Sequence, residues 1–278
     1  MGANRRHVMA AIATAALLAL MPVLLAATWS RASSERIALG CGQTVTTSVT
    51  LMADLTACGN SGLTIGADGI VINLNGHTIS GTGAWGIGDE AFSSVVIKNG
   101  TITGFQRGVN IEGGSATIQG LRISGATFDG IFASVSTVIT GNVVYDTGAV
   151  GIFAGGCCHA GRSTITNNVV NGNRGDGIVV GTGETGTMVS GNRALSNADD
   201  GMRLRAAGAT VSGNTANANG ANGIVLQSLA VPPSKAQANK AYFNTKLGIS
   251  IDPVDTDLGA NRADGNGSQH QCENVVCS

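Results

Sequence analysis

Residues 189–204, VSGNRALSNADDGMRL, are followed by the closely similar residues 211–226, VSGNTANANGANGIVL. In each stretch an asparagine, Asn192 or Asn214, precedes by nine residues a glycine that opens a short apolar segment. The same interval recurs elsewhere along the chain, so the sequence is a repeat and its architecture is decided first. Six asparagines hold the register: Asn142, Asn168, Asn192, Asn214, Asn239 and Asn261. Further toward the N-terminus this position holds His77, Gly100 and Leu121.

The repeat is short and consists of strand-forming residues. From glycine to glycine, successive units are 21 to 26 residues long, which suits one winding of a β-solenoid better than a pair of helices. The units contain Ile, Val, Thr, Asn and Gly, whereas helical repeats favour Leu, Ala, Glu and Lys. The sequence therefore predicts an all-β parallel β-helix of about eight to nine coils.

Apolar residues recur in three columns, which indicates three faces around one core. Apolar side chains two residues apart point to the same face of a strand, and this spacing follows each repeat glycine. One column lies directly after the glycine, a second lies three residues before the asparagine position, and a third lies two residues after it. The second column reads Leu74, Ile97, Ile118, Ile139, Ile165, Val189, Val211, Ala236 and Leu258.

The six asparagines are interpreted as a stacked structural ladder. Each amide is expected to bond to its equivalent in the next coil, about 4.8 Å away, as amide ladders do in cross-β stacks. A row of turn asparagines with a left-handed backbone has a similar spacing and is compatible with this interpretation.

The N-terminal region resembles a secretory signal. Arg5 and Arg6 precede an apolar run over residues 8–27 that ends in small residues, and we assign residues 1–30 as a signal peptide. The run is also long enough for an uncleaved anchor. We expect a secreted protein, with cell-envelope association left open and no membrane span after cleavage. The net charge of −1 and the lack of a basic run argue against nucleic acid as a partner.

Six cysteines in an exported chain indicate oxidised pairs. We expect Cys41 and Cys58 to staple an N-terminal cap and Cys272 and Cys277 to close the far end. Cys157 and Cys158 are adjacent, so a bond between them would form a tight, strained ring. The predicted divisions are a cap over residues 31–68, coils over 69–265 and a C-terminal cap over 266–278.

The two ends and the coils resemble secreted bacterial right-handed parallel β-helix repeat proteins. The resemblance rests on Cys41-Gly42, on residues 74–79 (LNGHTI), on the Gly-Asn coils and on the closing Gln271-Cys272 and Val276-Cys277. It implies a right-handed β-helix and secretion, but no particular reaction. More distantly the chain is similar to the pectin-lyase-like superfamily, whose enzymes act on acidic polysaccharides.

Outward-facing positions on the strands after the glycines supply candidate site residues. Arg203 and Arg205 lie two apart and suit a uronate carboxylate, or they are surface charges that pair with Glu184 or Asp252. Phe132 and Phe153 occupy neighbouring coils and offer a sugar platform or form a local apolar cluster. Glu112 is a further substrate-binding candidate on the same face.

The loop around Cys157, Cys158 and His159 is chemically unusual. His159 is a candidate general base, or a soft-metal ligand together with a free thiol. A metal site needs three or four ligands, and the sequence shows no further cluster, so a vicinal disulfide or surface loop is the simpler interpretation.

Catalytic motifs of the superfamily are incomplete. Asp199-Asp200 resembles the double aspartate of polygalacturonases, but the accompanying motifs are missing. Asp252-Pro253-Val254-Asp255 resembles the Asp-Pro-His-acid motif of uronan epimerases and lyases, but Val254 replaces the histidine. No cofactor is predicted, and calcium is left open.

The segments from each repeat glycine to the next asparagine position vary in length, so insertions collect along one face of the coils. We therefore predict a monomeric, secreted right-handed β-helix that binds polysaccharide or a cell-surface glycan along this insertion-bearing face. The alternative is a uronan lyase or C5-epimerase that uses Arg203, Arg205 and Asp252, with His159 as base. A third hypothesis is a periplasmic metal-handling protein that uses Cys157, Cys158 and His159.

Overall fold

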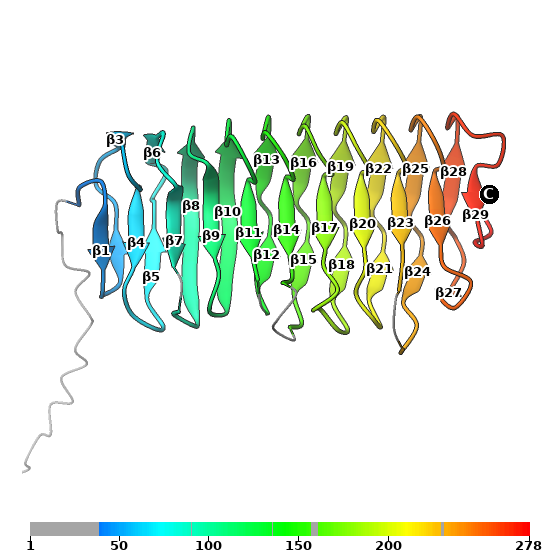
Figure 1. Ribbon diagram of the computed structural model, residues 1–278, viewed down its shortest axis with the longest axis horizontal. Coiled ribbons are helices and arrows are strands. Elements are labelled where there is room, and N and C mark those ends of the chain that lie inside the picture. The colour runs from blue at the N-terminus through cyan, green and yellow to red at the C-terminus, as the bar shows by residue number, and fades with distance from the viewer. Residues whose placement is uncertain (1–38, 90, 135, 157–160, 229–230) are drawn as a thin grey trace, which may run out of the picture. The chain divides into compact units, whose positions relative to one another are not determined.

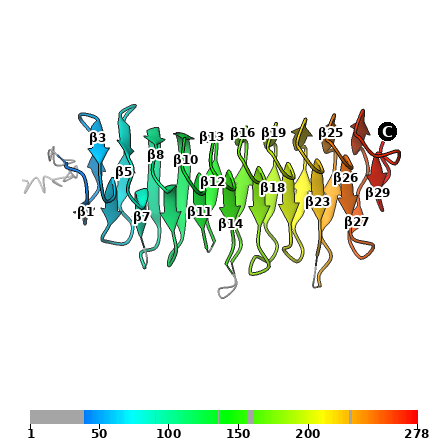
Figure 2. The ribbon, with the colours of Figure 1, turned by 45° about the horizontal axis from the view of Figure 1, so that its top comes forward.

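The computed structural model describes residues 39–89, 91–134, 136–156, 161–228 and 231–278. These residues belong to the unit Ser34–Ser278. The proposed signal peptide, and with it any anchor, lies outside the described residues. All secondary structure in the described residues is β-strand or turn, and the windings follow one another in a single row from β1 to β29 (Figures 1 and 2).

One face of this unit is an eleven-stranded parallel sheet that takes one strand from each winding. Most of its strands begin directly after a repeat glycine, as the apolar column at that position predicts, while β7 and β9 begin one residue before it. In order along the sheet they are β1 (Gln43–Val45), β4 (Leu63–Ile65), β7 (Trp85–Asp89), β9 (Arg107–Ile111), β11 (Ile131–Ala133), β14 (Ile152–Ala154), β17 (Ile178–Val180), β20 (Met202–Leu204), β23 (Ile224–Leu226), β26 (Ile249–Ile251) and β29 (Cys272–Glu273). We call it the glycine-side sheet.

The remaining strands form the other two faces and also pair in parallel from winding to winding. They are β2 (Val49–Thr50), β3 (Leu55–Cys58), β5 (Val71–Asn73), β6 (Thr78–Gly81), β8 (Val95–Thr103), β10 (Ala116–Ser124), β12 (Val138–Thr140), β13 (Val143–Tyr145), β15 (Thr164–Thr166), β16 (Val169–Asn171), β18 (Met188–Ser190), β19 (Arg193–Leu195), β21 (Thr210–Ser212), β22 (Thr215–Asn217), β24 (Lys235–Gln237), β25 (Lys240–Tyr242), β27 (Thr256–Asp257) and β28 (Arg262–Asp264). The parallel β-helix is thus confirmed. It has more windings than the eight to nine expected, because the segment before residue 69 contributes β1 to β4 in register with later strands.

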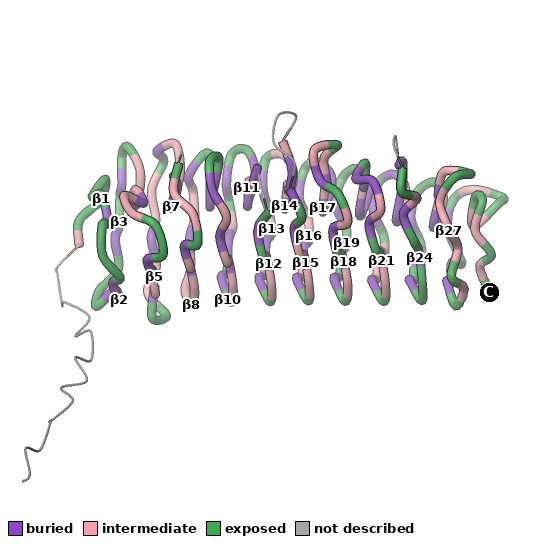
Figure 3. The backbone as a smooth tube through the Cα atoms, turned by 90° about the horizontal axis from the view of Figure 1, so that it is seen from below, coloured by how far each residue is buried: buried purple, intermediate pink, exposed green. Residues whose placement is uncertain are grey.

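The three apolar columns form the core, and buried residues recur along every winding (Figure 3). The second column is buried from Leu74 to Ala236, but Leu258 is 47% exposed. In this last winding Asp257 lies opposite Ala236. A shift of one residue moves a side chain to the other face of a strand, so Leu258 points outward.

The asparagine ladder has the predicted stacking. Asn192 Oδ1 accepts hydrogen bonds from the backbone N–H and the Nδ2 of Asn168 at 2.9 and 3.0 Å, and Asn192 Nδ2 donates to Ile165 O at 2.7 Å. The pattern repeats from Asn142 to Asn261, and all six side chains are buried. Where the position holds Gly100 or Leu121, the strand instead runs through it, as in β8 and β10.

A second ladder, which our sequence analysis missed, lies five residues after the first. Its members are Asn173, Asn197, Asn219, Asn244 and Asn266, each bonded through Oδ1 or Nδ2 to its equivalents in adjacent windings. Both ladders are closed at the C-terminal end by other side chains. Asp257 Oδ1 accepts from Asn261 Nδ2 at 2.8 Å, and Gln271 Oε1 accepts from Asn266 Nδ2 at 2.8 Å.

The ladders also explain the repeat glycine. A Cβ added at Gly201 would lie 2.6 Å from Asn219 Nδ2 and 2.6 Å from Gly223 O in the next winding. Only a glycine allows the second ladder and the following strand to approach so closely.

The two terminal disulfides form as predicted. Cys41 bonds to Cys58 with Cα atoms 5.3 Å apart, and Cys272 bonds to Cys277 with Cα atoms 6.2 Å apart. Cys157 and Cys158 lie outside the described residues.

We predict that N192A destabilises the protein by about 3 kcal/mol or more, because it leaves the buried N–H of Asn168 and the carbonyl of Ile165 without partners. The free energy of unfolding from urea titration measures this. N171A, at an exposed position of β16, is the matched control. Equal losses in the two variants would contradict the ladder's role.

Candidate functional site

A hollow of about 330 Å³ lies on the outward face of the glycine-side sheet, near its N-terminal end. Its walls come from β7, β9 and the segments that enter β7, β9 and β11. The lining residues are Ala84, Trp85, Gln106, Arg107, Asn110, Glu112 and Phe128. It therefore lies mainly beside the short connections that enter this sheet, and Glu112, directly after β9, is its one lining residue on a connection that leaves the sheet.

Strand register creates the hollow. Trp85 is paired with Arg107, and Gly88 with Asn110, so the large side chains of β7 and β9 stand side by side. Gly88 leaves space on this face, and a Cβ there would lie 2.9 Å from the Trp85 ring. The Nε1–H of Trp85 is buried and meets no acceptor within the described part of the chain.

Arg107 is the central polar group. Its Nη1 donates to Asn110 Oδ1 at 2.6 Å and to Glu112 Oε1 at 3.2 Å, while its Nε lies 3.5 Å from Asp129 Oδ2. Its guanidinium carbon lies 4.0 Å from the centre of the Phe132 ring. These contacts fix a guanidinium that would otherwise be mobile, because a cation over an aromatic face is attracted by the ring quadrupole.

Phe132 and Phe153 stack as their adjacent positions predict, with ring centroids 5.3 Å apart and planes inclined by 7°. Phe132 is thus packed against Arg107 from the preceding winding and Phe153 from the following one. Their role as a sugar platform stays a prediction. The 55% exposed aromatic side chain beside Arg107 is Phe128, which the sequence analysis missed because it lies in a turn outside the strand columns.

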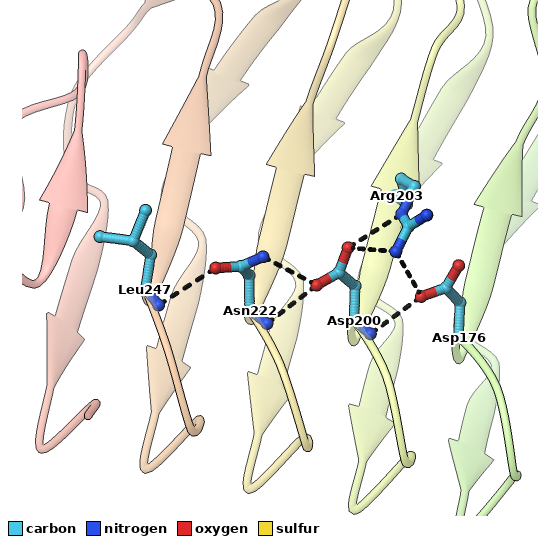
Figure 4. A network of polar contacts seen from close by, with 5 residues as sticks. All are labelled: Asp176, Asp200, Arg203, Asn222 and Leu247. Carbon is cyan, nitrogen blue, oxygen red and sulfur yellow. Dashed lines mark hydrogen bonds and ion pairs between the residues drawn. The ribbon is translucent and has the colours of Figure 1, made fainter. Parts of the chain in front are cut away.

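Arg203 belongs to a different cluster on the same sheet, on β20, which is five strands beyond β7 (Figure 4). Its Nη2 lies 2.8 Å from Asp200 Oδ2 and 3.3 Å from Asp176 Oδ1. The pairing with Glu184 or Asp252 that we considered was therefore wrong, because carboxylates of its own and the preceding winding are nearer. Burial tends to lower the pKa of Arg203, but Asp176 and Asp200 more than offset this and raise it.

The carboxylates of this cluster also bond to backbone. Asp176 Oδ1 accepts from Asp200 N at 2.8 Å, Asp200 Oδ1 accepts from Asn222 N at 2.8 Å, and Asn222 Oδ1 accepts from Leu247 N at 3.1 Å (Figure 4). Asp200 thus holds adjacent windings together. Burial raises the pKa of Asp176 to about 6, against the opposing effect of Arg203.

The other proposed catalytic residues do not gather around Arg203. Arg205 is exposed and makes no ion pair among the residues that the structure describes. Arg205, Gln227 and Asp252 occupy equivalent positions in three successive windings. Arg205 and Asp252 are therefore separated by two windings, or about 10 Å. His159 lies outside the described residues. Within those residues, no three His, Cys, Asp or Glu side chains cluster to hold a metal ion.

Comparison with known proteins agrees with this architecture. A family model for the right handed beta helix region matches residues 46–192 and 107–256. The chain belongs to this right-handed β-helix family. No curated protein matches it significantly.

Two solved structures resemble this β-helix. An alginate lyase from Paenibacillus sp. str. FPU-7 has a TM-score of 0.56 and 15% identity, over 84% of this chain and 99% of that one. The Dettilon tailspike protein has a TM-score of 0.55 and 19% identity, over 86% of this chain and 59% of that one. At these identities the likeness shows the shared fold alone. Among the described residues, no helix is long and apolar enough to cross a membrane.

The raised pKa of Asp176 predicts a pH dependence. Between its ordinary pKa of 3.8 and the folded value of about 6, the folded protein binds more protons at this site than the unfolded chain. Its stabilising contribution is therefore present below about pH 4 and is lost as the pH rises through 6. We expect D176N to lack this loss. The free energy of unfolding of D176N minus that of the wild type should therefore increase from about pH 4 to about pH 7.

Urea titrations at several pH values measure this difference. D146N, at an exposed turn position, is the control and should keep the wild-type profile. Parallel profiles for the wild type and D176N would show that Asp176 does not titrate in this range.

Proposed function

We propose that this protein is a polysaccharide-binding β-helix and that the hollow around Arg107 receives the glycan. The observation that carries the proposal is the combination of two aromatic walls, Trp85 and Phe128, with polar groups directed to the same space. A sugar ring has an apolar C–H face and a rim of hydroxyl groups. Binding it therefore requires an aromatic surface together with a few fixed hydrogen-bonding groups.

The polar groups of the hollow are fixed before any ligand arrives. Arg107 is held by Asn110, Glu112 and Asp129 and by the ring of Phe132. Because these side chains lose little further freedom on binding, the entropic cost of association is reduced. The rigid parallel sheet beneath them supports the same arrangement.

Binding is preferred over catalysis because the described candidates for acid-base chemistry do not converge. Arg203 is engaged by Asp176 and Asp200, while Arg205 and Asp252 lie windings apart. Proton transfer requires groups within hydrogen-bond reach of one another and of a common substrate atom. A uronan lyase or epimerase stays the alternative, and an R203A variant with reduced turnover of alginate or pectate would favour it.

We also infer that the protein acts outside the cytoplasm. Two disulfides close the ends of the described chain, and such bonds persist mainly in oxidising compartments. A glycan partner is accessible there, in the cell envelope or beyond.

We predict that F128A weakens glycan binding roughly tenfold or more, because it removes the most exposed apolar wall of the hollow. Screening of the full chain on an immobilised glycan panel identifies the ligand, and isothermal titration measures the loss. F243A, which removes a 71% exposed phenylalanine outside the hollow, is the control. If F128A binds as tightly as the wild type, the hollow is not the binding site.

A further inference from the structure

The charges in the hollow determine which glycans it suits. Arg107 is its single cation among the lining residues, and it faces two carboxyl groups, those of Glu112 and Asp129. A uronate would therefore meet one positive and as many as two negative groups. The positive group is also the one already engaged.

Arg107 already faces two acidic side chains before any ligand arrives. Two of its nitrogens point to Asn110, Glu112 and Asp129, and its plane lies over Phe132. A carboxylate that bound Arg107 would also lie close to Glu112, whose Oε1 is 3.2 Å from Arg107 Nη1, and would face a second negative charge. Like charges at this range repel strongly where water is partly excluded.

The net charge of these groups is not positive in either protonation state of Asp129. Burial raises the pKa of Asp129, against the backbone N–H of Val150 and the charge of Arg107. With Asp129 ionised the three groups sum to −1, and with Asp129 protonated they sum to zero. In neither state does the hollow carry the positive charge that an acidic polysaccharide requires.

Hydroxyl groups fit the same site well. The Glu112 side chain is 47% exposed, and its contacts with Arg107 and Asn110 both use Oε1. Oε2 is therefore free to accept from a sugar hydroxyl, and hydrogen bonds to an ionised acceptor are stronger than neutral ones. The Gln106 amide adds a donor and an acceptor at the edge of the hollow.

We infer that the hollow selects an uncharged, hydroxyl-rich sugar residue and discriminates against uronates, with Glu112 as the specificity-determining residue. This inference rests on the proposed function. It implies that this chain disfavours acidic polymers such as alginate, for which the similar lyase is named.

The test compares neutral with acidic oligosaccharides on the full-length protein. The probes are hexamers of β-1,4-glucan, mannan and fully methyl-esterified galacturonan on one side, and of alginate and unesterified galacturonan on the other. We expect at least one neutral hexamer to bind tenfold or more tightly than every acidic one. Its affinity should change little with ionic strength, because no ion pair with the ligand forms.

E112Q supplies the second arm. Removal of the carboxylate should weaken the binding of neutral hexamers several-fold and strengthen the binding of acidic ones. The ratio of the two affinities should therefore fall. E273Q, which changes an exposed glutamate on β29 of the same sheet, should leave the preference unchanged.

The outcomes separate the two proposals. Acidic hexamers that bind as tightly as neutral ones, or an E112Q variant with the wild-type preference, would overturn the inference while leaving glycan binding intact. Absence of binding to both classes would instead remove the proposed function, and the inference with it.

Discussion

Hydrogen bonding of buried amide side chains to the backbone of the neighbouring winding is the constraint on which this molecule depends. A chain that turns sharply between two parallel strands buries N–H groups that the strands themselves do not pair, and each would be costly without a partner. Two columns of asparagines supply the acceptors, from Asn142 to Asn261 and from Asn173 to Asn266. Because the amides fill this space, the adjoining position must be glycine, as at Gly201.

In-register stacking of windings also determines what the surface can offer. Side chains at equivalent positions lie about 4.8 Å apart, so neighbouring windings make contact in pairs and threes. Phe132 and Phe153 are such a pair, with Arg107 packed on Phe132, and Asp176 and Asp200 are another, joined by Arg203. A hollow with aromatic walls lies beside Arg107, whereas Arg203 is bonded to Asp176 and Asp200. The contrast arises from the side chains at single positions of an otherwise regular sheet.

The periodicity of the sequence was enough to predict the β-helix and the first asparagine ladder, because each depends on spacing alone. The terminal disulfides were predicted from the number of cysteines and their places at the two ends of the coils. The second ladder was equally readable, since Asn197 and Asn219 stand five residues after Asn192 and Asn214. The hollow was not, because Phe128 and Gln106 lie in turns outside the three apolar columns, where the repeat does not determine the residue type. Which carboxylates pair with Arg203 depends on how far side chains reach between windings, and the aligned repeats do not specify this. Leu258 departs from its column because the last winding is shifted by one residue, so that Asp257 lies opposite Ala236.

Closure of both ladders by Asp257 and Gln271 has a consequence for how such chains evolve. Inside the stack every asparagine has an identical neighbour on each side, so duplication or deletion of one complete unit preserves all of its bonds. At the C-terminal end of the ladders a carboxylate and an amide take the place of the next asparagines and act as a stop for the array. Length can therefore change by recombination between repeats while one C-terminal sequence continues to end the protein.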